Sequence, residues 1–255
     1  KDQNFSTLLP QVRRALVSAL GRFERNDSLD ILNPLLSEQS YFVEQQAAIA
    51  VGRSSKNLPL DSHEKKSMIQ LLKDLANTTT TFQNLLARGA IDGLKEFSRD
   101  EDEQIVKDVA DFIVAKSNYG NDYLVRRTAI AALGKFLRNK NKEVNNKVFD
   151  QLMILLKDKR FNLQIDACVS LVDPDATVLK PDAKLLEAIE ELTWIAQHDL
   201  DGWIRREAEV SLNKMRKWIK DWLDKPLDLV VSIREEERES EERMIQARRS
   251  LTDMY

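Results

Sequence analysis

Apolar residues along most of this chain recur at intervals of three and four, the period of an α-helix with one buried face. No stretch alternates apolar and polar residues for long enough to predict a β-strand. The chain holds only seven glycines and six prolines, so long periodic segments run uninterrupted between them. The pattern therefore predicts an all-α protein.

Six segments repeat one helical pattern, and their first apolar residues lie 31 to 43 residues apart. We number each repeat from that residue, so position 0 is Val12, Val43, Leu86, Val125, Leu163 and Ile204. In all six copies position 4 is Leu or Ala, position 7 is Ala, Gly or Ser, and position 8 is Leu or Val. These positions share one helix face, so we expect one buried stripe in every copy. A small residue at position 7 lets a neighbouring helix approach closely.

Five further segments with helical periodicity lie between the six repeated ones, at residues 28–38, 62–76, 102–116, 143–157 and 182–197. A hairpin of two such helices cannot cover its own apolar face and must stack on the next hairpin. The sequence thus predicts a solenoid of about six helical hairpins over residues 1–222. A charged capping helix or arm is expected at residues 223–255, where Pro226 is followed by many charged residues.

The second helix of each unit has the form V-R-R-x-A-x-x-A-L-G in its clearest copies, and the units are near 40 residues long. This pattern resembles HEAT repeats, which are armadillo-type α-solenoids, and the match is best at Val12, Val125 and Ile204. HEAT repeats often carry an Asp before the second helix, and Asp122 and Asp201 occupy that place here. The resemblance implies a right-handed α-α superhelix.

A longer stretch, residues 78–136, is similar to the C-terminal helical-repeat region of some bacterial zinc aminopeptidases of the aminopeptidase N family. Residues 40–52 match the repeat that precedes it there. The catalytic HExxH and Gly-Ala-Met-Glu-Asn motifs of that family are absent from this sequence. The resemblance therefore implies an accessory module that shapes access to a catalytic domain or recruits partners, with zinc only in an upstream catalytic domain. The first residue is Lys1 rather than Met, which favours a fragment of a longer protein.

Charge and cysteine content restrict the other functions. The 42 acidic and 39 basic residues leave a net charge of −3, so no overall field attracts nucleic acid or an anionic membrane. Cys168 is the single cysteine and lies in an apolar run, which predicts a buried, unreactive thiol and a reducing compartment. No segment approaches the roughly 20 apolar residues of a membrane span, so we expect a cytoplasmic protein.

Two local motifs suggest metal binding but are incomplete. His63-Glu64-Lys65-Lys66-Ser67 has the first half of HExxH with Ser in place of the second His, and we favour a helix start capped by Ser62. The stretch from Asp199 to Gly202 lacks the later ligands of a calcium loop, and Asp201 is the expected cap of the next helix. We therefore expect no catalytic residue, metal or cofactor in this chain.

The four tryptophans are confined to the last third of the chain, at Trp194, Trp203, Trp218 and Trp222. Trp218 and Trp222 lie one helical turn apart, so a shelf that stacks nucleotides or binds a peptide is one interpretation. Packing into the core at the end of the solenoid is the interpretation we favour.

Arginines recur with the repeat. Position 2 is Arg14, Arg88, Arg127 and Arg206 in four copies, and position 10 is Arg22, Arg53, Lys135 and Lys214 in four. On the concave side of a solenoid they would form a basic seam for an acidic peptide or for phosphates. The alternative, which we favour, is that they pair with carboxylates or carbonyls of adjacent turns. The sequence predicts a protein or peptide partner, or an upstream catalytic domain; a nucleic-acid-binding seam is the alternative.

Overall fold

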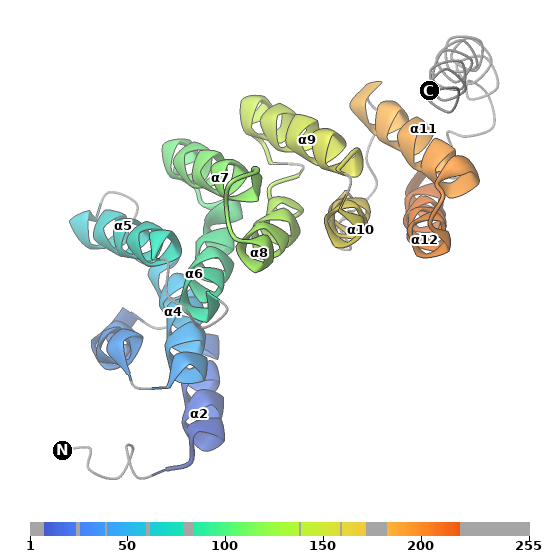
Figure 1. The fold of residues 1–255 in the computed structure, drawn as a ribbon. Helices are drawn as coiled ribbons and strands as arrows, with labels where there is room; N and C mark the ends of the chain where they lie inside the picture. Colours follow the sequence, from blue (N-terminus) through green and yellow to red (C-terminus); the bar gives the residue numbers. More distant parts are fainter. Residues whose placement is uncertain are drawn as a thin grey trace. The chain divides into compact units, whose positions relative to one another are not determined.

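The computed structural model describes residues 8–23, 26–38, 40–59, 62–78, 84–137, 139–158, 160–171 and 183–219. All regular secondary structure in these residues is helical, as the sequence predicts (Figure 1). The chain divides into two compact units, residues 1–173 and 174–255, and each is described by itself. The predicted boundary at residue 222 and the predicted C-terminal helix lie outside the described residues.

The described part of the first unit is a leading helix followed by four helical hairpins. Its elements are α2 (Pro10–Arg22), η1 (Asn26–Ser28), α3 (Leu29–Leu32), η2 (Asn33–Ser37), α4 (Tyr41–Ser55), α5 (His63–Asn77), α6 (Leu85–Leu94), η3 (Lys95–Arg99), α7 (Glu103–Ser117), α8 (Tyr123–Leu133), α9 (Lys142–Leu156) and α10 (Phe161–Ser170). The second unit contains one described hairpin, α11 (Ala183–His198) and α12 (Gly202–Ile219).

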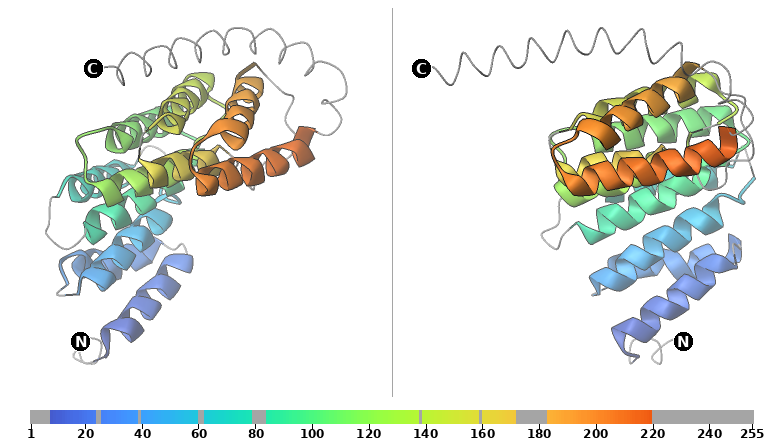
Figure 2. Two further views of the ribbon diagram at one scale, coloured as in Figure 1. Left: turned by 45° about the vertical axis from the view of Figure 1, so that its right-hand side comes forward. Right: turned by 90° about the vertical axis from the view of Figure 1, so that its right-hand side faces the viewer.

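The helices of the first unit form two layers. The second helices α2, α4, α6, α8 and α10 lie side by side, and α5, α7 and α9 pack on them from one side (Figures 1 and 2). Each first helix packs on the second helix of its own hairpin, and each second helix packs on the next one. This arrangement is an α-solenoid of helical repeats, which confirms the predicted fold class.

The predicted buried stripe is present from the second copy onward. Positions 0, 4 and 8 are at most 9% exposed in those five copies, and position 7 is buried as well. In the first copy the prediction is wrong, because Val12 and Leu16 are 43% and 44% exposed. The reason is that no described first helix packs on α2.

The expected helix at residues 28–38 is present but broken into η1, α3 and η2. Pro34 lies at the start of η2, and a proline inside a helix removes one backbone donor and crowds the preceding turn. The two predicted N-caps are confirmed, because the side chains of Ser62 and Asp201 accept hydrogen bonds from backbone N–H groups two or three residues on. Asp122 caps α8 in the same way. Cys168 is fully buried, also as predicted.

Adjacent second helices touch through backbone atoms. A Cβ added to Gly52, at position 9 of α4, would lie 2.3 Å from the carbonyl oxygen of Gly93 at position 7 of α6. Real Cβ atoms do not approach that closely, so a glycine is required for the two helices to keep this distance. The small residue predicted at position 7 therefore meets the backbone of the preceding helix.

We expect Gly52→Ala to lower the free energy of unfolding by about 2 kcal/mol or more, because the new methyl must push α4 and α6 apart. The loss would occur although Ala is the better helix former. Urea unfolding followed by far-UV circular dichroism measures it. Gly202→Ala is the matched control, since its Cβ would meet nothing nearer than 3.5 Å; an equal loss in both variants would contradict the packing explanation.

Candidate functional site

The position 2 arginines of α6 and α8 contact the next second helix. Arg88 Nε donates to Thr128 Oγ1 at 3.2 Å. Arg127 donates from Nε and NH2 to the two carboxylate oxygens of Asp166, at 2.6 and 3.0 Å. The hydrogen bond to Asp166 raises the pKa of Arg127. Thr128 and Asp166 both occupy position 3, so the contact follows the repeat.

The other two position 2 arginines stack on aromatic rings. The guanidinium carbon of Arg14 lies 5.9 Å from the ring centre of Phe42, and that of Arg206 lies 5.8 Å from Trp203. Both arginines are exposed. Trp203 is itself 67% exposed, so the predicted core packing is wrong for this tryptophan. Arg206 and Lys214 belong to the second unit. What they share with the basic residues of the first unit is the repeat position in the sequence.

One of the basic residues at position 10 also forms an ion pair. Arg53 Nε lies 3.2 Å from Glu96 Oε1, and Glu96 occupies the same position in the next copy. Lys135 is half-buried, whereas Lys214 is exposed. Lys95, on the same side of the stack, lies 2.6 Å from Asp92. The predicted basic seam is thus interrupted by carboxylates of the protein itself.

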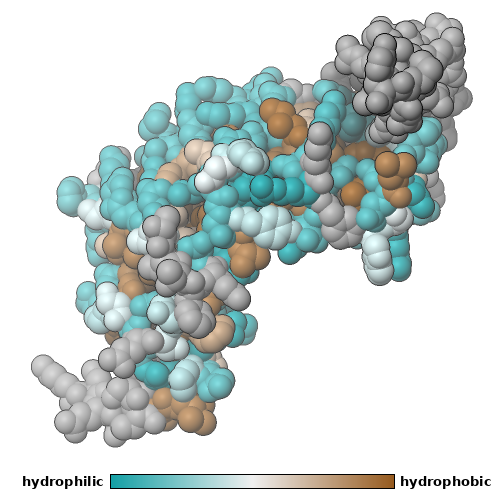
Figure 3. Space-filling view, in the orientation of Figure 1, coloured by the Kyte–Doolittle hydropathy of each residue, from teal (hydrophilic) through white to brown (hydrophobic). Residues whose placement is uncertain are grey.

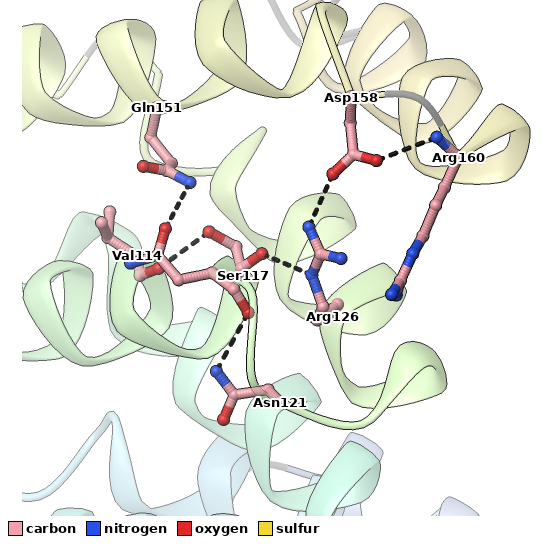
Figure 4. Close-up of polar contacts among 8 residues, drawn as sticks. Val114, Ser117, Asn121, Arg126, Gln151, Asp158 and Arg160 are labelled. Carbon is pink, nitrogen blue, oxygen red and sulfur yellow. Dashed lines mark hydrogen bonds and ion pairs between the residues drawn. The ribbon is translucent and has the colours of Figure 1, made fainter.

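Arg126, the first arginine of the pair in α8, was not singled out from the sequence but is the more buried one, at 2% exposure. Its Nε donates to the carbonyl oxygen of Ser117 at the end of α7, and its NH2 donates to Asp158 at 2.8 Å (Figure 4). One guanidinium therefore joins the first helix of its own hairpin to the loop before α10.

Each half of the Arg126 contact occurs once more at position 1 of another copy. Arg13 pairs with Glu38, and Arg205 donates to the carbonyl oxygen of Asp199 at 2.6 Å. Glu38 and Asp158 both lie five residues before position 0 of the following copy. An acid at this offset after an Arg at position 1 is the sequence signal that could have identified the pairs of Arg13 and Arg126.

The turn next to Arg126 is held by several side chains. Asn121 Nδ2 donates to the carbonyl oxygen of Ala115, and Gln151 Nε2 donates to Asn118 Oδ1 at 2.9 Å. Tyr119, in the same turn, is 82% exposed, and the guanidinium carbons of Arg126 and Arg160 lie 5.9 and 5.3 Å from its ring centre. These contacts organise the edge of the stack where the turns between the two helices of each hairpin lie, which we call the loop edge.

The side of the second-helix layer opposite the buried stripe is formed by positions 2 and 6, which lie about 200° and 240° around the helix from position 0. We call this surface the outer face; in the four hairpins it comprises Gln45, Ile49, Arg88, Asp92, Arg127, Ala131, Ile165 and Val169. Its middle is charged and its α10 end is apolar, with Val169 43% exposed. The Arg127 side chain remains 39% exposed although it is paired.

The opposite edge of the stack, where each hairpin connects to the next, contains two polar hollows of about 510 and 670 Å³, which share Arg99, Asp100 and Glu101 in their walls. Beneath them Lys65 Nζ lies 2.6 Å from Asp100 Oδ2, and both side chains are 2% exposed. This buried ion pair connects α5 to the loop before α7. The hollows are therefore lined by residues that hold the hairpins together.

The incomplete metal motifs have structural contacts. His63 Nδ1 lies 3.3 Å from Ser67 Oγ at the exposed start of α5. Among the described residues no group of three or more His, Cys, Asp or Glu side chains is arranged to hold a metal ion. None of the described helices combines the length and the apolar character that crossing a membrane requires. Trp222 and the side chain of Trp218 lie outside the described part of the chain.

We expect the two adjacent arginines to contribute unequally to stability. Arg126→Ala should lower the free energy of unfolding by about 3 to 5 kcal/mol, because it leaves the Asp158 carboxylate and a buried carbonyl without their partner. Arg127→Ala should cost about 1 kcal/mol or less, because that pair is partly solvated. Urea unfolding of the two variants measures the difference, and equal losses would contradict it.

No protein-family model matches the chain, and no curated protein matches its sequence. Among solved structures, it is similar to a designed armadillo repeat protein for modular peptide recognition, with 14% identity, a TM-score of 0.44, and coverage of 83% of this chain and 97% of that one. A designed armadillo repeat protein in complex with the peptide (KR)4 shows 15% identity, a TM-score of 0.47 and coverage of 83% and 96%. A HEAT-like repeats protein from the archaeon Thermococcus onnurineus NA1 shows 12% identity, a TM-score of 0.34 and coverage of 83% and 98%. Each is similar to this chain in helical-repeat architecture alone.

Proposed function

We propose that this chain is a non-catalytic helical-repeat module that binds an extended segment of a partner protein along its outer face. The observation that supports this most directly is the fixing of Arg88 and Arg127 by Thr128 and Asp166 of the next repeat. A guanidinium has five donors in a rigid fork, and a contact along one edge holds the group in place while other donors remain for a ligand. A pre-positioned side chain loses less entropy on binding than a free one.

The spacing of the helices suggests the form of the ligand. Adjacent packed helices lie about 8 to 10 Å apart, so the outer-face residues of successive repeats are separated by about that distance. A polyproline II segment rises about 3.1 Å per residue with three residues per turn, so every third side chain points the same way at about 9 Å intervals. Successive third residues of such a segment would therefore meet successive repeats.

The chemistry of each repeat then specifies the ligand residues. Carboxylates three residues apart would face Arg88 and Arg127, and an aliphatic residue three further along would face Ile165 and Val169. Gln45 on α4 would accept a polar group at the other end. The proposed ligand is an extended acidic segment with one aliphatic anchor.

Fluorescence anisotropy with labelled proline-rich decapeptides tests this proposal. The peptides would carry two Glu residues three positions apart and a Leu three positions beyond, in both chain directions. We expect peptides of one chain direction to bind. Arg88→Glu should weaken their affinity about tenfold or more, because it places a carboxylate opposite a Glu of the peptide. Val169→Asp should weaken the affinity as well, because it would bury a carboxylate against the Leu of the peptide.

Lys66→Glu is the matched control for these variants, because Lys66 is an exposed cation on α5 in the other layer. It should leave the affinity unchanged. A control peptide with the Glu residues two positions apart should bind more weakly than the original. If neither peptide direction binds at millimolar concentration, or if Arg88→Glu binds as well as the parent, the proposal is wrong.

Three finer proposals come from the sequence. The resemblance of residues 78–136 supports a partner in the form of a catalytic domain of an aminopeptidase N-like zinc enzyme, and an HExxH motif upstream in the gene product would test it. We also propose a cytoplasmic location and a module that needs no metal or cofactor. The net charge of −3 provides no overall attraction for a phosphate backbone, which disfavours the nucleic-acid alternative.

A further inference from the structure

We propose that the uncovered face of α2 binds an amphipathic helix of a partner protein, with aliphatic residues in heptad spacing and acidic residues beside them. This helix would occupy the place that a first helix takes in the following hairpins. The surface lies at the end of the first unit, on a different set of residues from the outer face. The inference is therefore independent of the proposed peptide binding.

The exposed apolar residues of α2 follow the spacing of a coiled-coil seam. Intervals of three, four, three and four residues separate Leu9, Val12, Leu16, Ala19 and Phe23. Leu9 and Phe23 are each 69% exposed, Val12 and Leu16 are 43% and 44% exposed, and Ala19 is exposed too. Strict alternation of three and four places all five on a narrow stripe that suits a second helix. Apolar surface is visible at this end of the stack (Figure 3).

The equivalent residues in the later repeats show what covers such a stripe. Phe23 is at position 11, where α6 and α8 are followed by Phe97 and Phe136, and both of those rings are fully buried. Val12 corresponds to Leu86 and Val125, which are 9% and 5% exposed. In those hairpins the first helices α5 and α7 pack on the second helices. The α2 face thus continues an interface that elsewhere in the protein is filled by a helix.

Charge distinguishes a partner helix from a second copy of the same chain. The α2 segment carries Arg13, Arg14 and Arg22 and no acidic residue. Pairing α2 with its own copy would place arginines near arginines, and like charges across a helix pair are unfavourable. Arg22 is exposed at the edge of the stripe, where it can meet a carboxylate of the partner. A helix with Glu beside its apolar seam fits both features.

The test uses the whole chain and a labelled peptide of three heptads, with Ile and Leu at positions a and d and Glu at e and g. Fluorescence anisotropy should detect binding, and a peptide with Lys at e and g should bind at least about tenfold more weakly. Leu16→Asp should abolish binding, while Ile154→Asp, at a 65% exposed residue of α9, should not affect it. Arg22→Glu should reverse the preference between the two peptides.

Leu16 is exposed, so Leu16→Asp should unfold at the parent's temperature, and Arg22→Glu provides a second variant that does not alter the apolar stripe. Binding of the Glu peptide that survives Leu16→Asp would overturn the proposal, as would no binding at all. Equal affinity for the Glu and Lys peptides would also overturn it.

A dimer of the chain alone in sedimentation equilibrium, lost in Leu16→Asp, would show that a second copy is the occupant instead. Arg88→Glu should bind the heptad peptide normally, which separates this result from the outer-face test.

Discussion

In α4, α6 and α10 the small residue at position 7 lies against the glycine at position 9 of the preceding second helix, and this contact sets the distance between these helices. Gly93 meets both Gly52 and the carbonyl oxygen of Ala48, while Gly134 approaches Ser170 where α8 packs on α10. Such contacts hold the second helices in one tight layer. The offset between one repeat and the next then decides which side chains can reach each other.

The arginine contacts depend on that offset. Arg127 reaches Asp166 because position 2 of α8 lies beside position 3 of α10, and Arg88 reaches Thr128 for the same reason. Arg126 is one residue earlier and thus about 100° around the helix, which directs it into the interface with Ser117 and Asp158. Two adjacent arginines therefore have different roles: one holds the loop edge together, and the other is fixed on a partly exposed surface. The proposed ligand site consists of side chains that the stack itself has positioned.

The ends of the repeat array follow different rules from its interior. Within the array, an apolar stripe is covered by the first helix of its own hairpin and by the preceding second helix. On α2 neither neighbour is present among the described residues, so side chains of the same type at the same repeat positions are exposed. The proposed helix site and the proposed peptide site thus arise from one repeat pattern in two settings.

The sequence by itself determined the helical class, the helix positions and the N-caps, because these depend on residues within one or two turns of each other. The period of Val43, Ala47 and Val51 and the side chain of Asp201 contain that information locally. Only the tertiary structure decided which arginine is buried, which is paired, and that Val12 and Trp203 are exposed. Asp158 and Asp166 lie 32 and 39 residues from their arginines, and the connecting segments vary in length. The pairing therefore depends on how successive hairpins are offset in space, which local periodicity does not specify.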